Sequence, residues 1–227
     1  CLDKTGTITS GRMTVEGTYP LPVEGSVARD AAELLPREVS VLDFALANVA
    51  RATSADANET CKALLDFYAE SQVPVRKPER VVPFSSAKKW SGASFAEGAF
   101  VMGAAQFVLA PAEFAEVEMR VAELASTCRV LVVAHVDGFT EDGEMVGTAR
   151  PVGFVTIRDE IRTSAAETIG YFCEQGVELN VISGDDPRTV SSIAQLVGVP
   201  GADAYVDATT LDTAAKIEAA VDRYPVF

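Results

Sequence analysis

The C-terminal third of the chain alternates between helical and strand-like patterns of apolar positions. Apolar residues recur at helical spacing through 162–176, and the run stops at Gly176, which predicts a helix with a glycine at its C-terminal end. A short β-rich run follows at 177–182. A second helix is predicted next, with Asp186 as its N-cap and Pro187 in its first turn. Helix, strand, loop and helix in this order are typical of a parallel α/β sheet.

The middle of the chain follows a different pattern. Amphipathic segments at 39–53 and 60–72 predict two helices. Short β-rich runs then come in close succession, as they do in antiparallel hairpins. These runs span 80–86, 89–95, 98–103, 129–136 and 152–157.

The two patterns together predict an α/β fold class. A partial parallel sheet of the Rossmann-like kind is interrupted by an inserted α+β domain with an antiparallel sheet. We place the first segment of the parallel domain at 1–14, the inserted domain at 15–157 and the second segment at 158–227. Residues 20–25, PLPVEG, are the nearest thing to a linker.

Composition narrows the function classes. With 48% hydrophobic and 23% charged residues among 227, the chain has the balance of a folded globular protein. Its formal net charge of −14 argues against non-specific binding to nucleic acid or anionic lipid. No run approaches the length of about 20 apolar residues that spans a bilayer. The four cysteines and the single histidine, His135, form neither a zinc pattern nor a disulfide framework, and His135 lies in an apolar run that favours a structural role.

The segment DKTGT at 3–7 carries the first candidate chemistry. If Cys1 and Leu2 end a buried parallel strand, Asp3 lies at the carboxyl end of the sheet, where such folds bind ligands. A carboxylate exposed there can attack phosphorus and form an aspartyl phosphate. Lys4 would offer positive charge, and the backbone around Gly6 would offer N–H donors. The alternative is a plain turn, but a specified run of five residues is improbable by chance.

A second candidate segment, at 183–185, follows the β-rich run at 177–182. If that strand neighbours the strand before Asp3, then Ser183, Gly184 and Asp185 reach the same edge of the sheet. The Ser183 hydroxyl could then hold a phosphoryl oxygen. Alone, this segment is equally typical of a turn followed by a helix cap.

These two segments resemble the P-type ATPases, ion pumps whose phosphorylation domain belongs to the haloacid dehalogenase superfamily. Residues 3–9, DKTGTIT, match the phosphorylation sequence of that family at every position. The resemblance implies that Asp3 accepts the γ-phosphoryl group of ATP, that Asp3 and the Thr5 carbonyl bind Mg²⁺, and that Lys4 and Thr5 support the phosphate. Ser183, Gly184 and Asp185 resemble the Thr-Gly-Asp segment of the family. Asp159 and Arg162 match a hinge pattern whose prolines this chain lacks.

The resemblance also implies a nucleotide-binding role for the inserted domain. Phe84 would stack on adenine, Lys89 would contact the nucleotide, and Arg129 would reach the phosphates. Thr60 and the loop of Met102 and Gly103 complete the implied set, with Met102 as an apolar wall where the family commonly has lysine. A cluster of cations around Glu79 predicts a phosphate-attracting patch; its members are Arg76, Lys77, Arg80, Lys88 and Lys89.

The implied whole is a bacterial pump of the calcium-related branch, with ATP and Mg²⁺ as its cofactors. We expect this chain to be a soluble piece that faces the cytoplasm of a plasma-membrane protein. Absent membrane helices would bind the transported cation, and the intact protein would supply actuator and membrane domains as partners. The inserted domain would swing on hinges at 10–16 and 156–162, and the isolated piece would turn over little ATP.

Three alternatives come from other function classes. A phosphatase of the same superfamily would need a second aspartate at position 5, which is threonine. A receiver domain would not carry so large an insertion. A non-catalytic nucleotide-binding or regulatory module stays open because of Met102.

Overall fold

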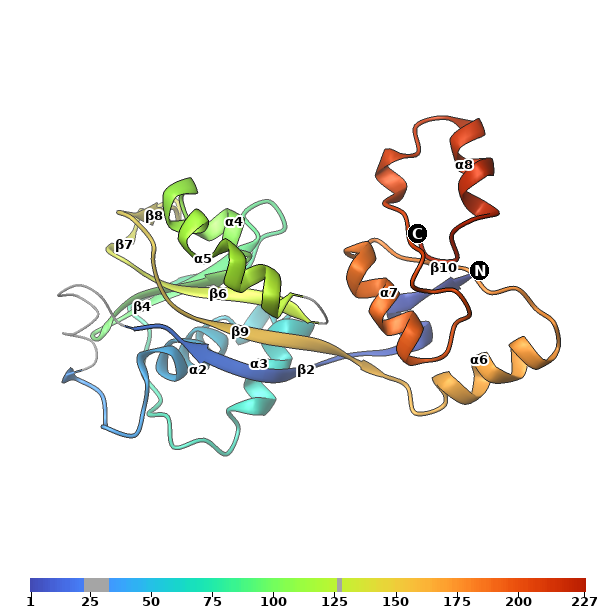
Figure 1. The fold of residues 1–227 in the computed structure, drawn as a ribbon. Helices are drawn as coiled ribbons and strands as arrows, with labels where there is room; N and C mark the ends of the chain where they lie inside the picture. Colours follow the sequence, from blue (N-terminus) through green and yellow to red (C-terminus); the bar gives the residue numbers. More distant parts are fainter. Residues whose placement is uncertain (23–32, 126–127) are drawn as a thin grey trace. The chain divides into compact units, whose positions relative to one another are not determined.

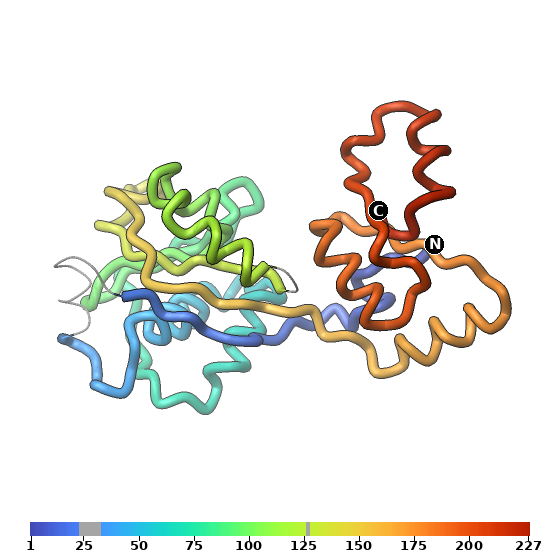
Figure 2. Tube along the Cα trace, viewed as in Figure 1, coloured from blue at the N-terminus to red at the C-terminus, as the bar shows by residue number. Residues whose placement is uncertain are grey.

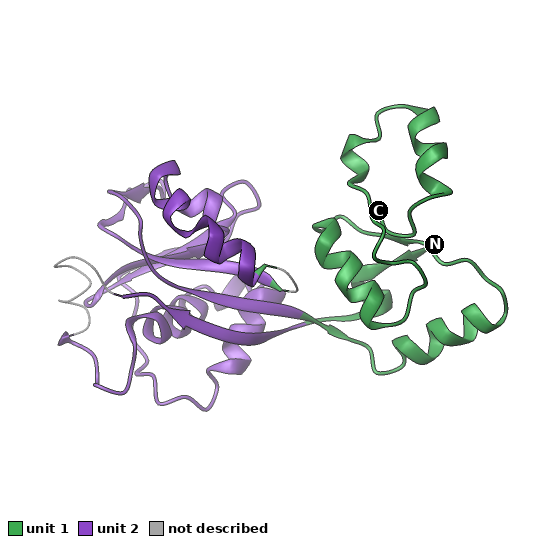
Figure 3. Ribbon diagram, viewed as in Figure 1, with its two compact units in different colours: residues 1–12, 125–128, 159–227 green, residues 13–124, 129–158 purple. Residues whose placement is uncertain are grey.

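The computed structural model describes residues 1–22, 33–125 and 128–227, and the chain forms two compact units (Figures 1 and 3). Unit 1 is built mainly from residues 1–12 and 159–227, and unit 2 is built from residues 13–124 and 129–158. The chain passes from one unit to the other within two long strands, β2 (Thr9–Pro20) and β9 (Arg150–Ile161). The expected linker at 20–25 lies partly outside the described residues.

Unit 2 is organised around a six-stranded sheet with the order β2-β9-β6-β5-β4-β3. Its other strands are β3 (Arg80–Val82), β4 (Trp90–Phe95), β5 (Gly98–Gly103) and β6 (Arg129–Val136). The pairs from β3 to β6, and β6 with β9, are antiparallel. A separate two-stranded hairpin joins β7 (Gly138–Phe139) to β8 (Met145–Val146). The predicted antiparallel sheet is therefore confirmed.

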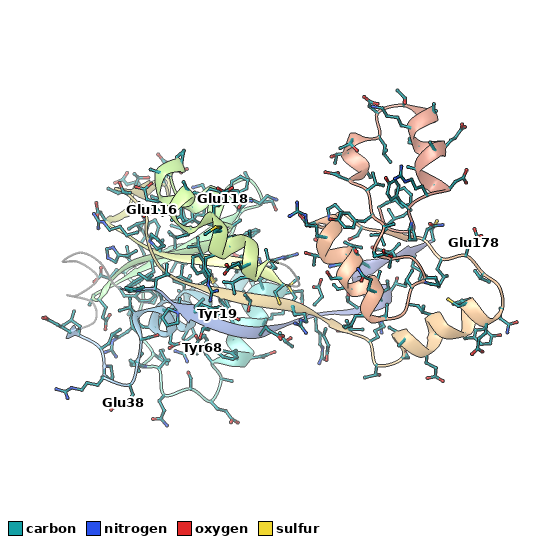
Figure 4. All side chains as sticks on the ribbon, viewed as in Figure 1. Tyr19, Glu38, Tyr68, Glu116, Glu118 and Glu178 are labelled. Carbon is teal, nitrogen blue, oxygen red and sulfur yellow. The ribbon has the colours of Figure 1, made fainter. Side chains whose placement is uncertain are left out.

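Helices and apolar side chains cover both faces of this sheet. On one face, Phe44 of α2 (Val41–Ala52) packs edge-on against Phe95 and Phe100, beside α3 (Glu59–Phe67). The Tyr68 hydroxyl donates to Asp43 over 2.7 Å and ties the end of α3 to α2. Figure 4 labels Tyr68 in unit 2. The opposite face carries a second apolar cluster that includes residues of α4 (Ala105–Val108) and α5 (Pro111–Leu124).

Unit 1 holds a short parallel pair, β1 (Leu2–Asp3) and β10 (Val181–Ile182). Between β1 and β2 lies the tight turn η1 (Lys4–Ile8), in which Thr5 and Gly6 leave helical backbone angles. Helices α6 (Ala165–Glu174), α7 (Pro187–Leu196) and α8 (Ala214–Val221) and the short helix η3 (Ala208–Thr210) complete the unit. Both ends of the chain lie in this unit (Figure 2), where the Phe227 N–H donates to the Val181 carbonyl over 2.9 Å.

Several element bounds differ from those that the pattern predicts. The strand expected at 177–182 is only Val181–Ile182. The strand expected at 80–86 ends at Val82, because residues 85–89 fold into a turn in which the Lys89 N–H donates to the Ser85 carbonyl over 2.8 Å. The predicted α/β class, a parallel sheet with a separate antiparallel sheet, is confirmed.

Candidate phosphorylation and nucleotide sites

Asp3 lies at the carboxyl end of β1, directly beside the carboxyl end of β10. Leu2 pairs with Val181 and Asp3 with Ile182 in a parallel register. The Asp3 side chain is exposed, and an open hollow of about 360 Å³ lies at this edge. Its lining consists of Cys1, Leu2, Asp3, Ile182, Ser183 and Gly184. The two predicted segments thus follow neighbouring strands, as the sequence argument requires.

A set of hydrogen bonds closes the turn that follows Asp3. The Thr5 N–H donates to Asp3 Oδ1 over 3.3 Å. The Thr9 hydroxyl accepts from the Gly6 N–H over 3.3 Å and donates to the Lys4 carbonyl over 3.2 Å. Gly6 has a φ of +80°, which a residue with a side chain adopts only with strain. The Asp3 carboxylate is therefore held by a turn whose backbone is fixed from within.

Lys4 links three segments of unit 1. Its side chain is 1% exposed, and its ammonium group forms ion pairs with Asp159 and Asp185. Burial alone would lower the pKa of Lys4, but hydrogen bonds and charge from the two carboxylates outweigh it and raise the pKa above its ordinary value. From the sequence, Lys4 is expected to support the phosphoryl group; in the structure, the Asp159 and Asp185 carboxylates balance its charge.

Arg162 supports the same turn from the other side. Its guanidinium donates to the Gly6 carbonyl over 2.8 Å and to the Thr9 carbonyl over 3.2 Å. The Arg162 N–H also donates to the Ile8 carbonyl over 3.0 Å. Arg162 and Asp159 were visible in the sequence as parts of a hinge pattern. The bridging role of Thr9 was missed, and its only signal was its place at the end of the DKTGTIT run.

The nucleotide candidates lie in unit 2, where Gly103 lies against the Lys89 backbone. Phe84 follows β3 and is 42% exposed. Lys89 is exposed and has a φ of +59°. Its carbonyl accepts from the Ala104 N–H over 3.2 Å, and a Cβ on Gly103 would lie 2.5 Å from the same carbonyl oxygen. Gly103 thus allows a close approach that a side chain would prevent.

The remaining nucleotide candidates are placed differently. Met102 is only 5% exposed and belongs to the cluster with Phe44, whereas the resemblance implies an apolar wall against adenine. Thr60 lies in the first turn of α3, and its hydroxyl contacts the Met13 sulfur at 3.6 Å. Arg129 is the exposed first residue of β6.

The predicted phosphate-attracting patch is largely paired within unit 2. Arg76 Nε lies 2.5 Å from Glu97 Oε1. Arg80 donates to the Glu141 carbonyl over 2.7 Å. Lys88 donates to the Gly143 carbonyl and pairs with Glu144, both at 2.8 Å. Arg76, Arg80 and Lys88 therefore form contacts inside unit 2. The prediction that all five cations of the cluster attract phosphate is corrected for these three.

Two features of the described residues concern metal ions and membranes. Within 1–22, 33–125 and 128–227, no group of three or more His, Cys, Asp or Glu side chains is arranged to hold a metal ion. Over the same ranges, every helix is too short or too polar to cross a bilayer.

A family model described as haloacid dehalogenase-like hydrolase matches residues 1–221. The chain belongs to the haloacid dehalogenase-like hydrolases. This membership agrees with an exposed aspartate at the carboxyl end of a parallel strand.

Curated relatives point to transport ATPases. Calcium-transporting ATPase CtpE of Mycolicibacterium smegmatis is 34% identical over 203 residues, which are 88% of this chain and 23% of that protein. Probable cation-transporting ATPase exp7 of Streptococcus pneumoniae is 34% identical over 214 residues, or 93% of this chain and 25% of that protein. The chain thus spans about a quarter of the length of these relatives. The predicted resemblance to cation-transporting ATPases is confirmed.

A solved structure supports the fold. The crystal structure of a zinc-transporting PIB-type ATPase aligns with a TM-score of 0.54 at 22% identity. The alignment covers 87% of this chain and 27% of that one. At this level of identity the likeness concerns the fold.

Proposed function

We propose that this chain is the nucleotide-binding and phosphorylation part of a cation-transporting P-type ATPase, and that ATP phosphorylates Asp3. The observation that carries the proposal is the exposed Asp3 carboxylate at the end of β1, beside Ser183 and Gly184 in one open hollow. The relatives named as cation-transporting ATPases support it. By the same argument the whole protein would be a membrane pump, with calcium as the first ion to test.

The reaction follows from the position of Asp3. A carboxylate oxygen attacks the γ-phosphorus, an O–P bond forms, and the bond between this phosphorus and the leaving ADP oxygen breaks. Hydrolysis of the acyl phosphate by water then restores Asp3. Ser183 Oγ accepts from the Asp185 N–H over 3.3 Å, which leaves its own proton to donate to a phosphoryl oxygen.

Lys4 acts in this scheme by fixing positions. It holds Asp185 and Asp159 beside the turn that carries Asp3. The ends of β1 and β10 therefore keep their alignment when the negatively charged phosphates of ATP bind. The turn itself is closed by Thr9 and Arg162.

Mg²⁺ fits the oxygen atoms present at this edge, although the fit is incomplete. Asp3 offers an exposed carboxylate and Thr5 a backbone carbonyl, and Mg²⁺ commonly takes one or two carboxylates together with phosphate oxygens and water. The ion would neutralise charge on the transferring group. Phosphate oxygens of ATP would complete its coordination.

Nucleotide binding belongs to unit 2 in this proposal. Phe84 stacks on adenine, Lys89 and Arg129 face the phosphates, and Thr60 and Gly103 shape the site. Since these residues and Asp3 belong to different units, the proposal includes movement of unit 2 about the segments where the chain passes between units. The predicted hinges at 10–16 and 156–162 contain those points.

The test uses the full-length parent protein and γ-labelled ATP. We expect an acid-stable, hydroxylamine-sensitive label that Asp3→Asn abolishes. Asp222→Asn, which removes an exposed carboxylate of the same unit, is the matched control and should label normally. Label that persists in Asp3→Asn would contradict the proposal.

A further inference from the structure

Lys88 and Lys89 are adjacent in sequence but have different environments. Lys89 is exposed, with a left-handed backbone. The Lys88 ammonium lies 2.8 Å from the Gly143 carbonyl, 2.8 Å from Glu144 Oε1 and 5.4 Å from the centre of the Trp90 ring. Carbonyl, carboxylate and aromatic face together satisfy a lysine ammonium. Lys88 therefore makes its contacts within unit 2, whereas Lys89 is exposed to solvent.

The contacts of Lys88 belong to a larger attachment of the β7–β8 hairpin. Phe139 of β7 stacks on Trp90, with ring centres 6.2 Å apart and planes at 20°. Arg80 donates to the Glu141 carbonyl over 2.7 Å. The hairpin tip is closed by two hydrogen bonds of 2.9 Å between residues 140 and 143–144. The hairpin thus contacts the chain before Phe84, through Arg80, and after it, through Lys88 and Trp90.

Phe84 lies between these two attachments. Val82 is buried in β3 on one side of it. On the other side, Ser85 accepts from the backbone of both Lys88, at 3.1 Å, and Lys89, at 2.8 Å. The segment 83–89 is a loop that follows Arg80 and contains Lys88, and both of these side chains contact the same hairpin. Such a loop loses less conformational entropy when a ligand orders it.

We propose that Lys88 is a positioning residue, which fastens segment 83–89 to the β7–β8 hairpin and so holds Phe84 and Lys89 ready for a nucleotide. The inference rests on the proposed function, because it concerns the same nucleotide site. It assigns to Gly143, Glu144 and Trp90 a part in nucleotide binding through Lys88. Lys88 itself does not contact the phosphates.

The first test needs no nucleotide. Chymotrypsin can cut after Phe84, and Trp90, the only tryptophan of the chain, lies in the attachment. Lys88→Met and Glu144→Gln should speed cleavage after Phe84 and change acrylamide quenching of Trp90. Lys88→Arg should preserve both readouts because arginine can still donate to Gly143. Lys77→Met, which removes an exposed cation of the same cluster, is the matched charge control and should change neither.

The second test measures ATP, ADP and AMP binding to the 227-residue chain. A positioning role acts through Phe84 and the base as well as through Lys89 and the phosphates, so Lys88→Met should weaken all three, AMP included, by about 3- to 10-fold. Weaker binding of ATP and ADP with unchanged AMP affinity would make Lys88 a phosphate ligand and overturn the inference. If the unmodified chain binds the nucleotides and Lys88→Met binds them with unchanged affinity, the role of Lys88 is wrong but the proposed nucleotide site stands. No nucleotide binding by the unmodified chain would overturn both the inference and the proposed nucleotide site.

Discussion

Replacing Lys4 by methionine tests whether the buried ion cluster holds unit 1 together. The side chain of Lys4 is 1% exposed, and its partners Asp159 and Asp185 are 12% and 32% exposed. Methionine keeps much of the length of lysine but leaves two carboxylates facing each other without a cation. Loss of one partner from a buried pair costs about 3 to 5 kcal/mol, and we expect Lys4→Met to fall in this range.

The partners should differ according to their exposure. Asp159→Asn should cost more than Asp185→Asn, because Asp185 is nearly three times as exposed to water. The cost of Lys4→Met should shrink to below about 2 kcal/mol when both aspartates are already asparagine, since no buried charge is then left alone. The non-additivity of the unfolding free energies therefore tests the buried cluster as directly as the costs of the single substitutions do.

Amide hydrogen exchange in peptides that cover β1 and β10 reports on this unit by itself. Trp90 lies in unit 2, so its fluorescence during urea unfolding is an internal control that should move little. A cost below about 1 kcal/mol for Lys4→Met, or additive costs in the multiple variants, would refute the buried-cluster reasoning. The pH dependence has a defined sign: because the folded-state pKa of Lys4 is raised, its contribution is complete below the unfolded-state pKa and is lost as pH rises through the folded-state value.

Three further substitutions test other parts of the chain. Burial, and then the charge of Arg150, lower the pKa of His135, so unit 2 should lose stability as pH falls below about 6.5. His135→Gln should remove the part of this pH dependence that comes from the imidazole. An NMR titration of the single imidazole signal measures the pKa directly. Thr9→Val removes the hydroxyl that bridges the turn after Asp3 and should cost about 1 to 3 kcal/mol in urea unfolding of unit 1. Gly103→Ala places a Cβ 2.5 Å from the Lys89 carbonyl and should weaken ATP binding to the chain, whereas Gly170→Ala, with nothing within 4 Å, should not.

The position of Asp3 could be predicted from the sequence because the end of a strand is marked by local features of the chain. A short apolar run, a polar segment and a helix are local features, and parallel pairing then brings Asp3 beside Ser183. The role of Lys4 was less accessible. Its partner Asp159 is 155 residues away, and no local pattern says which of many acids will meet a buried ammonium.

Three elements that the sequence pattern did not predict, α5, α8 and β2, have few buried residues. Among residues of α5, only Val117 is buried, and in α8 only Ala220, so neither helix has a broad apolar stripe. Strand β2 has one buried residue, Thr9, and its exposed and half-buried positions alternate from Arg12 to Gly17. Such a strand is specified by its partner β9 at the edge of the sheet and only faintly by its own pattern.

The turn that carries Asp3 depends on the segment that ends β9. Asp159 pairs with Lys4, and Arg162 binds the carbonyls of Gly6 and Thr9. The earlier residues of β9 belong to the sheet of unit 2, so one continuous strand both carries the chain between units and contacts the turn. Side chains at 159–162 therefore serve the site as much as the connection, because they fix the backbone from which Asp3 projects. This double use explains why residues that match a hinge pattern are also the partners of the DKTGT segment.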